Sequence, residues 1–229
     1  MIARYDHGES DRILRLLTPS RGKVGVIAPR ARSPKSPYSG LDLGVGLRAR
    51  WRERGELGRL TEAEVVDPRA RLRESYERLA VASYCLELVG AFSREGQPEP
   101  KLYGLAEMAL VLLDGLDGGF ESAFVAALEG KVLSFAGLCP RLGSCARCGG
   151  ALEEATLFSL QSGASHRRCA PDEEGLLVVD PETLRRLEDL RRAPLREAIA
   201  GEAVEDLLYR VVVFQLGRPL RSRALLDVR

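Results

Sequence analysis

Residues 45–54 read VGLRARWRER, so that small or apolar side chains alternate with arginines along ten positions. Successive side chains of a β-strand point to opposite faces of a sheet, and strict alternation is therefore typical of a strand with one buried face. The segment predicts such a strand. Its inward face comprises Val45, Leu47, Ala49 and Trp51, and its outward face comprises Arg48, Arg50, Arg52 and Arg54.

The segments on either side of this strand also favour β structure. Residues 12–18 and 23–28 are of strand length, and the turn residues Pro19-Ser20-Arg21-Gly22 join them, which predicts a hairpin. Residues 57–66 predict a further strand, and residues 31–40, rich in Pro and Ser, predict a loop. Four to five short strands before Pro68 fit a small barrel, and we expect the five-stranded OB-fold.

The pattern becomes helical after Pro68. Apolar residues recur at spacings of three and four, which predicts a buried stripe formed by Leu72, Tyr76, Leu79, Ser83 and Leu86. Further helices are expected from Pro98 or Pro100 to Leu112, over 120–138, over 181–192, near Leu195 and over 202–216. The predicted fold class is α+β. The expected division is an OB-fold barrel at 1–68, an α-helical domain from 69–138 and 173–229, and an inserted zinc ribbon-like module at 139–172.

Charge is unevenly distributed although the whole chain has a formal net charge of only +1. Residues 1–60 contain 13 Lys and Arg against 6 Asp and Glu, whereas the remaining 169 residues contain 21 against 27. Such a basic segment suggests contact with a polyanion, although a highly charged surface can also cluster by chance.

Cysteines and one histidine form a pattern with metal-binding spacing, C-x2-C-x17-H-x2-C. The four residues are Cys145, Cys148, His166 and Cys169. Two pairs of ligands, each separated by two residues, are typical of structural zinc sites, and residues 156–163 suit the hairpin of a zinc ribbon. Cys139 is an alternative to His166 as the fourth ligand, and a metal-free cluster of thiols is a further alternative.

Enzyme motifs are missing from the sequence. It contains no phosphate-binding G-x-x-x-x-G-K-[ST] or G-x-G-x-x-G, no G-x-S-x-G, no H-E-x-x-H and no deaminase signature. Four ligands would also close the zinc shell, so we expect a structural ion and no enzymatic activity.

No apolar run reaches the ~18–20 residues of a membrane helix, and no charged-then-apolar leader opens the chain. We therefore expect a soluble, cytoplasmic and nucleoid-associated protein without a membrane partner.

Binding of a nucleic-acid strand requires cations for the phosphates and flat side chains for the bases. The predicted phosphate-binding residues are Arg12, Lys23, Arg30, Arg32, Lys35, Arg48, Arg50 and Arg52. Tyr38 and Trp51 are candidates for base stacking, although the alternation places Trp51 on the apolar face, where we expect it to pack in the core.

Several ordered segments together resemble the RecO family of DNA repair proteins. Residues 8–14 (GESDRIL), with Leu17-Thr18 and Gly22-Lys23, are similar to the opening segment of the family, and residues 30–36 (RARSPKS) to its basic loop. Residues 137–142 (GLCPRL) before Cys145 and Cys148, and residues 216–222 (LGRPLRS), are similar to its later segments.

The resemblance implies an OB-fold, a helical domain and a zinc module. It also implies binding of single- and double-stranded DNA, strand annealing, and help in placing RecA on strands coated with single-strand-binding protein, alongside RecR in a RecFOR-type pathway. The chain departs from the family pattern at His166, where the family commonly has Cys, and only a few residues precede Tyr5, so we expect a short first strand. Two other hypotheses stay open: an RNA-binding OB-fold and zinc protein linked to translation, and a zinc hydrolase on a helical scaffold.

Overall fold

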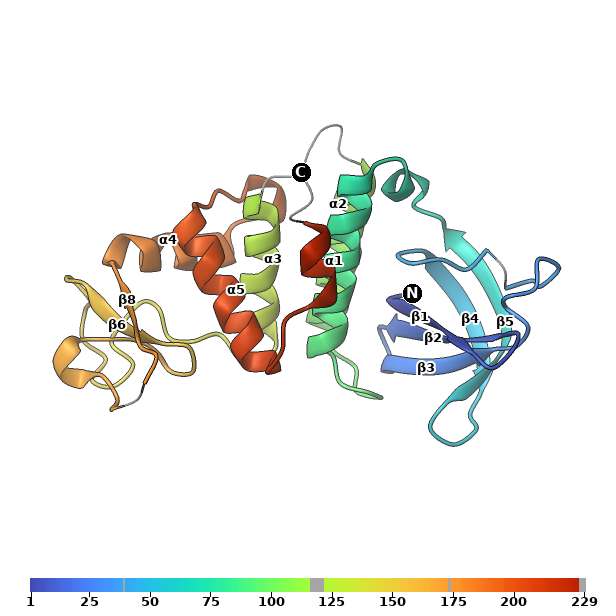
Figure 1. Cartoon of the computed structure of the whole chain (residues 1–229), viewed down its shortest axis with the longest axis horizontal. Helices are drawn as coiled ribbons and strands as arrows, with labels where there is room; N and C mark the ends of the chain where they lie inside the picture. The colour runs from blue at the N-terminus through green and yellow to red at the C-terminus, as the bar shows by residue number, and fades with distance from the viewer. Residues whose placement is uncertain (39, 116–121, 173, 227–229) are drawn as a thin grey trace. The chain divides into compact units, whose positions relative to one another are not determined.

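The structure is a computed structural model that describes residues 1–38, 40–115, 122–172 and 174–226. Strands dominate the N-terminal part and helices the rest, so the predicted α+β fold class is confirmed (Figure 1). The chain divides into two compact units. The first comprises Met1–Gly119 with Ser222–Arg229, and the second comprises Phe120–Arg221. The three-part division made from the sequence stays a prediction.

Five strands form the sheet of the first unit, in the order β1-β2-β3-β5-β4. They are β1 (Ala3–His7), β2 (Asp11–Thr18), β3 (Gly22–Ala28), β4 (Gly46–Arg52) and β5 (Gly58–Asp67). Neighbouring strands are antiparallel except β3 and β5, which are parallel. The sheet curls (Figure 1), and Met1 joins its two ends, since its amino group donates to the Val45 carbonyl at 2.8 Å and its carbonyl accepts from Gly44 N–H at 3.0 Å. This is the partly open five-stranded barrel of the OB-fold.

The barrel core confirms the alternation of the β4 sequence. Leu14, Val26 and Leu60 are buried, and Leu47, Ala49 and Trp51 pack against the cluster that they form. Gly58 makes room for the indole, because a Cβ at this position would lie 2.6 Å from Trp51 Cδ1. The apolar half of the β4 pattern therefore fixes which face of the sheet points outward.

Two helices complete the first unit: α1 (Tyr76–Phe92) and α2 (Pro100–Gly115), preceded by the short η1 (Ala70–Arg73). The predicted stripe on α1 was wrong in part, because Tyr76 and Leu79 are 54% and 38% exposed. The buried face instead runs through Val81, Cys85 and Leu88, among others. Since α2 and η1 both pack on α1, its buried face is wider and lies further round the helix than a single stripe predicts.

The second unit contains α3 (Ser122–Phe135), α4 (Pro181–Arg192), η3 (Leu195–Glu197) and α5 (Glu202–Leu216). The helix expected over 120–138 ends earlier, at Phe135, and residues 120 and 121 lie outside the described residues. Asp180 caps the start of α4, because its carboxylate accepts from Thr183 N–H at 2.8 Å. The segment that holds the clustered cysteines forms the small sheet β7-β6-β8 and the turn η2 (Arg167–Cys169). Its strands are β6 (Thr156–Ser159), β7 (Gly163–Ser165) and β8 (Leu177–Val179).

Among the described helices, none combines the length and the apolar character needed to cross a lipid bilayer.

Candidate nucleic-acid interface and metal centre

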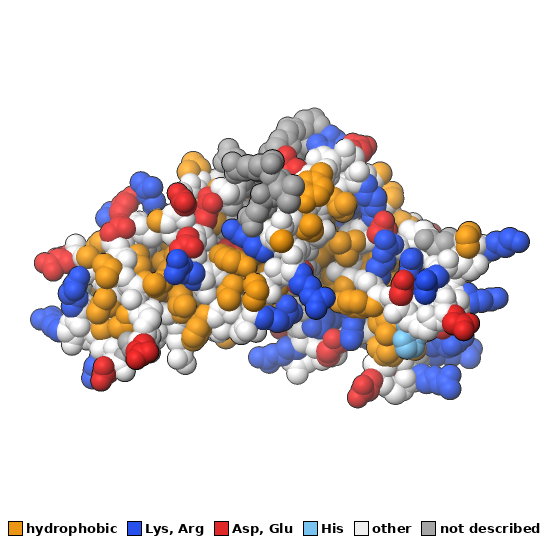
Figure 2. Space-filling model, in the orientation of Figure 1, with side chains coloured by type: hydrophobic (Ala, Val, Ile, Leu, Met, Phe, Trp, Pro, Cys, Tyr) orange, Lys and Arg blue, Asp and Glu red, His pale blue; other side chains and the backbone are white. Residues whose placement is uncertain are grey.

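The arginines of β4 face glutamates of β5. Arg48 forms an ion pair with Glu64 at 2.7 Å, and Arg50 forms one with Glu62 at 3.1 Å, in both cases across the two strands. The exposed fractions of the four side chains lie between 65% and 78%. The charge of the arginine face is thus largely compensated. Figure 2 shows the same mixture over the barrel, where Lys and Arg side chains alternate with Asp and Glu.

Three other predicted cations also have partners. Arg12 lies 3.2 Å from Asp6, and Arg32 lies 3.6 Å from the same carboxylate. Lys23 donates to the Gly90 carbonyl at 2.8 Å and lies 3.8 Å from Glu95, so it ties β3 to the end of α1. Its side chain is only 19% exposed. These contacts leave Lys23 little freedom to follow a bound strand.

The remaining predicted cations, Arg30, Lys35 and Arg52, are exposed, and no partner of their side chains occurs among the described residues. The backbone of Arg30 is fixed in the left-handed region at φ 54°, and its N–H donates to Asp11 at 2.8 Å. That hydrogen bond lowers the pKa of the Asp11 carboxyl below its ordinary value. Arg30 is therefore presented by a fixed backbone rather than by a loose loop.

A row of five cross-strand partners spans the outer face of the barrel. The register pairs Tyr5 with Ile13, Ile13 with Ile27, Ile27 with Arg59, and Arg59 with Arg52. Partners in register share one face of a sheet, and the adjacent Leu14, Val26 and Leu60 occupy the core face. We call Tyr5, Ile13, Ile27, Arg59 and Arg52 the outer row.

The outer row combines the features that a single strand of nucleic acid requires. Tyr5 is 55% exposed and offers a flat ring, and the two isoleucines are half-buried. Arg52 and Arg59 form no ion pair or hydrogen bond through their side chains among the described residues, although the charge of Arg59 helps to lower the pKa of the Asp11 carboxyl. Bases stack on aromatic rings, and phosphates bind guanidinium groups. Sequence reasoning missed both Tyr5 and Arg59. Only the strand order, which brings β5 between β3 and β4, places Arg59 beside Ile27 and Arg52.

The aromatic residues suggested from the sequence lie elsewhere. Tyr38 is buried, and its hydroxyl donates to the Thr61 carbonyl at 2.8 Å, so its suggested role in stacking was wrong. Trp51 packs against the core as expected, and Arg21 lies over its ring at 5.9 Å from the centroid.

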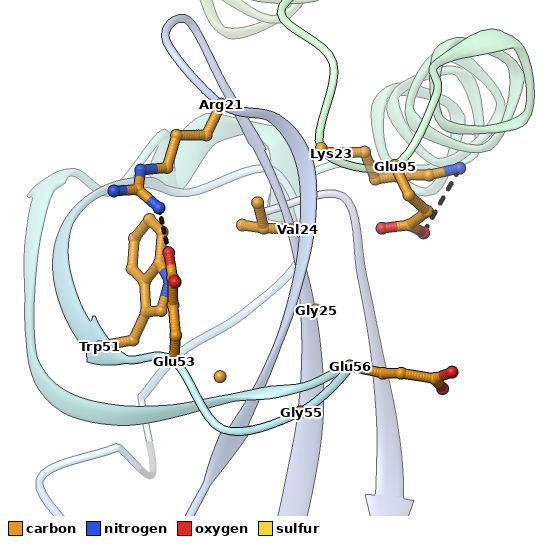
Figure 3. A pocket seen from close by; sticks show the side chains of 11 residues that line it. Arg21, Lys23, Val24, Gly25, Trp51, Glu53, Gly55, Glu56 and Glu95 are labelled. Atoms are coloured by element: carbon orange, nitrogen blue, oxygen red, sulfur yellow. Dashed lines mark hydrogen bonds and ion pairs between the residues drawn. The ribbon is translucent and has the colours of Figure 1, made fainter.

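A cavity of about 360 Å³ lies beside Trp51, between the β2–β3 turn, the β4–β5 turn and the residues after α1. Figure 3 shows Arg21 and Glu53 pointing toward each other beside the indole, and Lys23 facing Glu95 on the other side. Glu53, Glu56 and Glu95 all line the cavity. The carboxylates outnumber the two cations of the lining, Arg21 and Lys23, and both cations pair with a glutamate, so the outer row suits a nucleic-acid backbone better than this cavity does.

The structure brings together the four predicted metal ligands. One ligand atom from each of Cys145, Cys148, His166 and Cys169 lies within 4.8 Å of all the others. Backbone hydrogen bonds fold the first knuckle, since Cys145 N–H donates to the Gly150 carbonyl and Gly149 N–H to the Cys145 carbonyl, each at 2.9 Å. Gly150 also lies close to the cluster, because a Cβ there would be 3.3 Å from His166 Cε1 and 3.5 Å from Cys148 Sγ. Three thiols and an imidazole at these distances can hold a tetrahedral metal ion.

The environment of Cys145 favours a thiolate. Burial opposes its ionisation, but backbone N–H groups of Cys148, His166 and Arg147 outweigh this effect and lower the pKa of the Cys145 thiol to about 5. Metal ions bind thiolates rather than thiols. The first ligand is therefore prepared for a cation.

His166 is oriented by its second ring nitrogen. Nε2 lies 2.8 Å from the Ala151 carbonyl, and Nδ1 lies 3.5 Å from Cys148 Sγ. A carbonyl oxygen only accepts, so Nε2 carries the proton and the lone pair of Nδ1 faces the cysteines. Cys139 is not in this cluster. It is half-buried, and burial raises the pKa of its thiol. The geometry thus favours His166 over Cys139 as the fourth ligand.

Two family models match almost the whole chain. Residues 1–69 match the one described as Recombination protein O N terminal, and residues 73–224 match Recombination protein O C terminal. The chain belongs to the RecO family. This confirms the resemblance drawn from the sequence.

Relatives in the RecO family match this chain along most of their length. The DNA repair protein RecO of Myxococcus xanthus (strain DK1622) is 34% identical over 228 residues, which cover 97% of this chain and 92% of that protein. The DNA repair protein RecO of Anaeromyxobacter sp. (strain K) is 36% identical over 240 residues, with 99% and 93% covered. The function of this RecO-family chain therefore lies in DNA repair and recombination.

Proposed function

We propose that the chain is a DNA-binding recombination mediator of a RecFOR-type pathway in the bacterial cytoplasm, associated with the nucleoid. In this proposal it binds single- and double-stranded DNA, anneals complementary strands, and assists RecA in assembling on strands coated with single-strand-binding protein. Its expected protein partners are RecR and single-strand-binding protein, with RecA as an indirect partner. Membership of the RecO family supports the DNA repair part of the proposal.

The outer row is the observation that carries the DNA-binding part. A strand that crosses the row would meet the exposed Tyr5 ring at one end and the exposed Arg59 and Arg52 at the other. Arg30 and Lys35, on the loop that follows β3, would add two further cations without partners among the described residues. Cations that release condensed counterions provide most of the affinity for a phosphate backbone. The same neutralisation lowers the repulsion between two complementary strands, which is the physical basis of annealing.

We assign the metal centre a structural role with zinc as the ion. Cys145, Cys148, His166 and Cys169 would hold it, and four protein ligands leave no open coordination position for a substrate. Bound zinc would supply a fixed crosslink between the two knuckles. This crosslink would hold the sheet β7-β6-β8 in place. We expect no enzymatic activity from this centre.

The test is a titration of fluorescent single-stranded DNA at several salt concentrations. We compare the wild type with a variant that lacks the four barrel cations that form no ion pair among the described residues (Arg30→Ala, Lys35→Ala, Arg52→Ala, Arg59→Ala). Each lost phosphate contact reduces the slope of log affinity against log salt by ~0.7 for a single strand, so the variant should lose about 3 from its slope. Tyr5→Ala alone should weaken binding about tenfold or more without changing the slope, since stacking of one base contributes ~1–3 kcal/mol.

The matched control removes arginines that have partners. Arg48→Ala with Arg50→Ala deletes two equally exposed cations, but each is compensated by a glutamate, so the slope should change by less than in a double variant of Arg52 and Arg59. Equal slopes for these two double variants would contradict the assignment of the outer row.

Competition with RNA of equal length tests the translation-linked alternative, which requires RNA to bind more tightly than DNA.

A further inference from the structure

Four exposed arginines surround the metal ligands. Arg147 lies between Cys145 and Cys148, Arg167 and Arg168 lie between His166 and Cys169, and Arg141 precedes the first knuckle. Their side chains have no ion-pair or hydrogen-bond partner among the described residues.

Arginines elsewhere in the same unit behave differently. On α4, Arg185 and Arg186 both pair with Glu182, and Arg192 pairs with Glu188. The side chains of these three arginines are between 61% and 71% exposed, so exposure alone does not explain why the arginines near the metal ligands lack partners.

The knuckle geometry explains why these side chains are exposed. The backbone N–H of Arg147 is turned toward the Cys145 sulfur, and the second knuckle is closed by Cys169 N–H, which donates to the His166 carbonyl at 2.9 Å. Because the backbone faces the ligands, the side chains of Arg147, Arg167 and Arg168 extend into solvent.

The charge of the metal centre does not cancel that of the arginines. A divalent ion with three thiolates and a neutral imidazole carries one net negative charge, whereas the four arginines carry four positive charges. The described carboxylates nearest to the knuckles in the sequence, Glu153, Glu154, Asp172 and Glu174, lie outside the two C-x2-C and H-x2-C segments and form no ion pair with these arginines among the described residues. The tips of the two knuckles are therefore cationic.

We propose that the two knuckles form a second phosphate-binding surface, the knuckle surface (Arg141, Arg147, Arg167 and Arg168), which contacts the backbone of a nucleic-acid strand. The guanidinium group binds phosphate through two parallel hydrogen bonds, which suits an unpaired arginine on a fixed turn. This inference rests on the proposed function and deepens it. A chain with one surface on the barrel and another on the knuckles holds two strands at once, as annealing requires.

The test uses a triple variant, Arg147→Ala, Arg167→Ala and Arg168→Ala, in the full-length protein. The matched control is Arg185→Ala, Arg186→Ala and Arg192→Ala, which removes the same number of exposed arginines from the same unit but leaves the knuckles intact. Metal content, the salt dependence of binding to a single-stranded oligonucleotide, and the annealing rate of two complementary oligonucleotides are measured for each protein.

We expect the knuckle variant to keep its metal, to lose about 2 from the salt slope, and to anneal at least tenfold more slowly than the wild type. The control should stay close to the wild type in all three measurements. A knuckle variant that anneals and binds like the control overturns the proposal. Loss of metal, both here and in a variant with Gln at the same three positions, overturns it too, because the arginines would then serve the thiolates.

The failure of this inference is distinguishable from that of the proposed function. If the barrel variants lose DNA affinity while the knuckle variant does not, only the knuckle surface is refuted. If neither set changes DNA binding, the proposed function fails as well.

Discussion

Arg69 Nη2 lies 2.6 Å from Glu107 Oε2, a contact that joins the end of the barrel to α2. The Arg69 side chain is only 3% exposed, and it also donates to Asp67 at 2.9 Å and to the Gly44 carbonyl at 3.0 Å. One guanidinium group thus links β5, the segment before β4 and a helix. The position of the helices on the barrel depends on this residue.

Replacement of Arg69 by Ala should lower the free energy of unfolding by about 2 kcal/mol, because the buried guanidinium group loses its hydrogen bonds to Glu107, Asp67 and the Gly44 carbonyl. Chemical denaturation of the purified variant measures this change. The control is Arg48→Ala, which removes a surface ion pair and should cost less than about 1 kcal/mol. Similar losses for the two variants would mean that the buried contact does not stabilise the fold.

Lys23 should behave as a structural residue in the barrel. It donates to the Gly90 carbonyl, and hydrogen bonds from charged groups contribute about 1.5–3 kcal/mol, so Lys23→Ala should destabilise the protein by roughly that amount. The salt slope for DNA binding should stay unchanged. Denaturation and the fluorescence titration measure the two effects on the same sample. A lower slope with full stability would restore Lys23 to the predicted phosphate-binding set.

The metal content should distinguish His166 from Cys139. We expect His166→Ala and Cys145→Ser to reduce bound zinc well below the roughly one ion per chain of the wild type, since each removes one of four ligands. Cys139→Ser should leave the metal content unchanged. Elemental analysis after gel filtration provides the measurement, and a loss of zinc in Cys139→Ser alone would make Cys139 the ligand.

Asp180 should make α4 sensitive to acid. The Thr183 hydroxyl, at 2.7 Å, and the Thr183 N–H stabilise its carboxylate and lower the pKa of Asp180 below 3.8. A carboxyl whose pKa is lower in the folded state stabilises the fold at pH values above its unfolded pKa, and this stability is lost as pH falls through the lowered value.

Asp180→Ala should therefore cost about 1 kcal/mol at pH 7, as loss of a helix cap does. The difference from the wild type should shrink as the pH falls below 3.8. Urea denaturation at a series of pH values measures it. A difference that stays constant down to strongly acidic pH would show that the carboxylate charge is not involved.

The cluster of three cysteines and one histidine could be predicted from the sequence because each knuckle is a local turn. Cys145 with Cys148, and His166 with Cys169, are each two residues apart, so the backbone alone brings each pair together. The strand of β4 was predictable for a similar reason, since alternation depends only on the period of an extended chain. The OB-fold followed from the number and spacing of such segments.

The proposed DNA-binding face was harder to predict because it depends on pairing between distant strands. Glu62 and Glu64 alternate along β5, but only the antiparallel register with β4 places them beside Arg50 and Arg48. Tyr5 and Arg59 belong to one row only because β2, β3 and β5 lie side by side. Counting cations along the chain therefore selected some arginines that form ion pairs and overlooked Arg59, which forms none among the described residues. The stripe on α1 was misplaced for the same reason, since the helices that pack on α1 decide which of its faces is buried.

The ion pairs between β4 and β5 have a consequence beyond DNA. β4 is the last strand in the sheet order, and among the described strands it pairs with β5 alone. Met1 bonds only to Gly44 and Val45 just before β4, so the rest of this edge is a template for a strand of another molecule. Long charged side chains at alternate positions make such an addition unfavourable. We therefore expect Arg48 and Arg50, which pair with Glu64 and Glu62, to disfavour edge-to-edge aggregation of the barrel when the protein is concentrated.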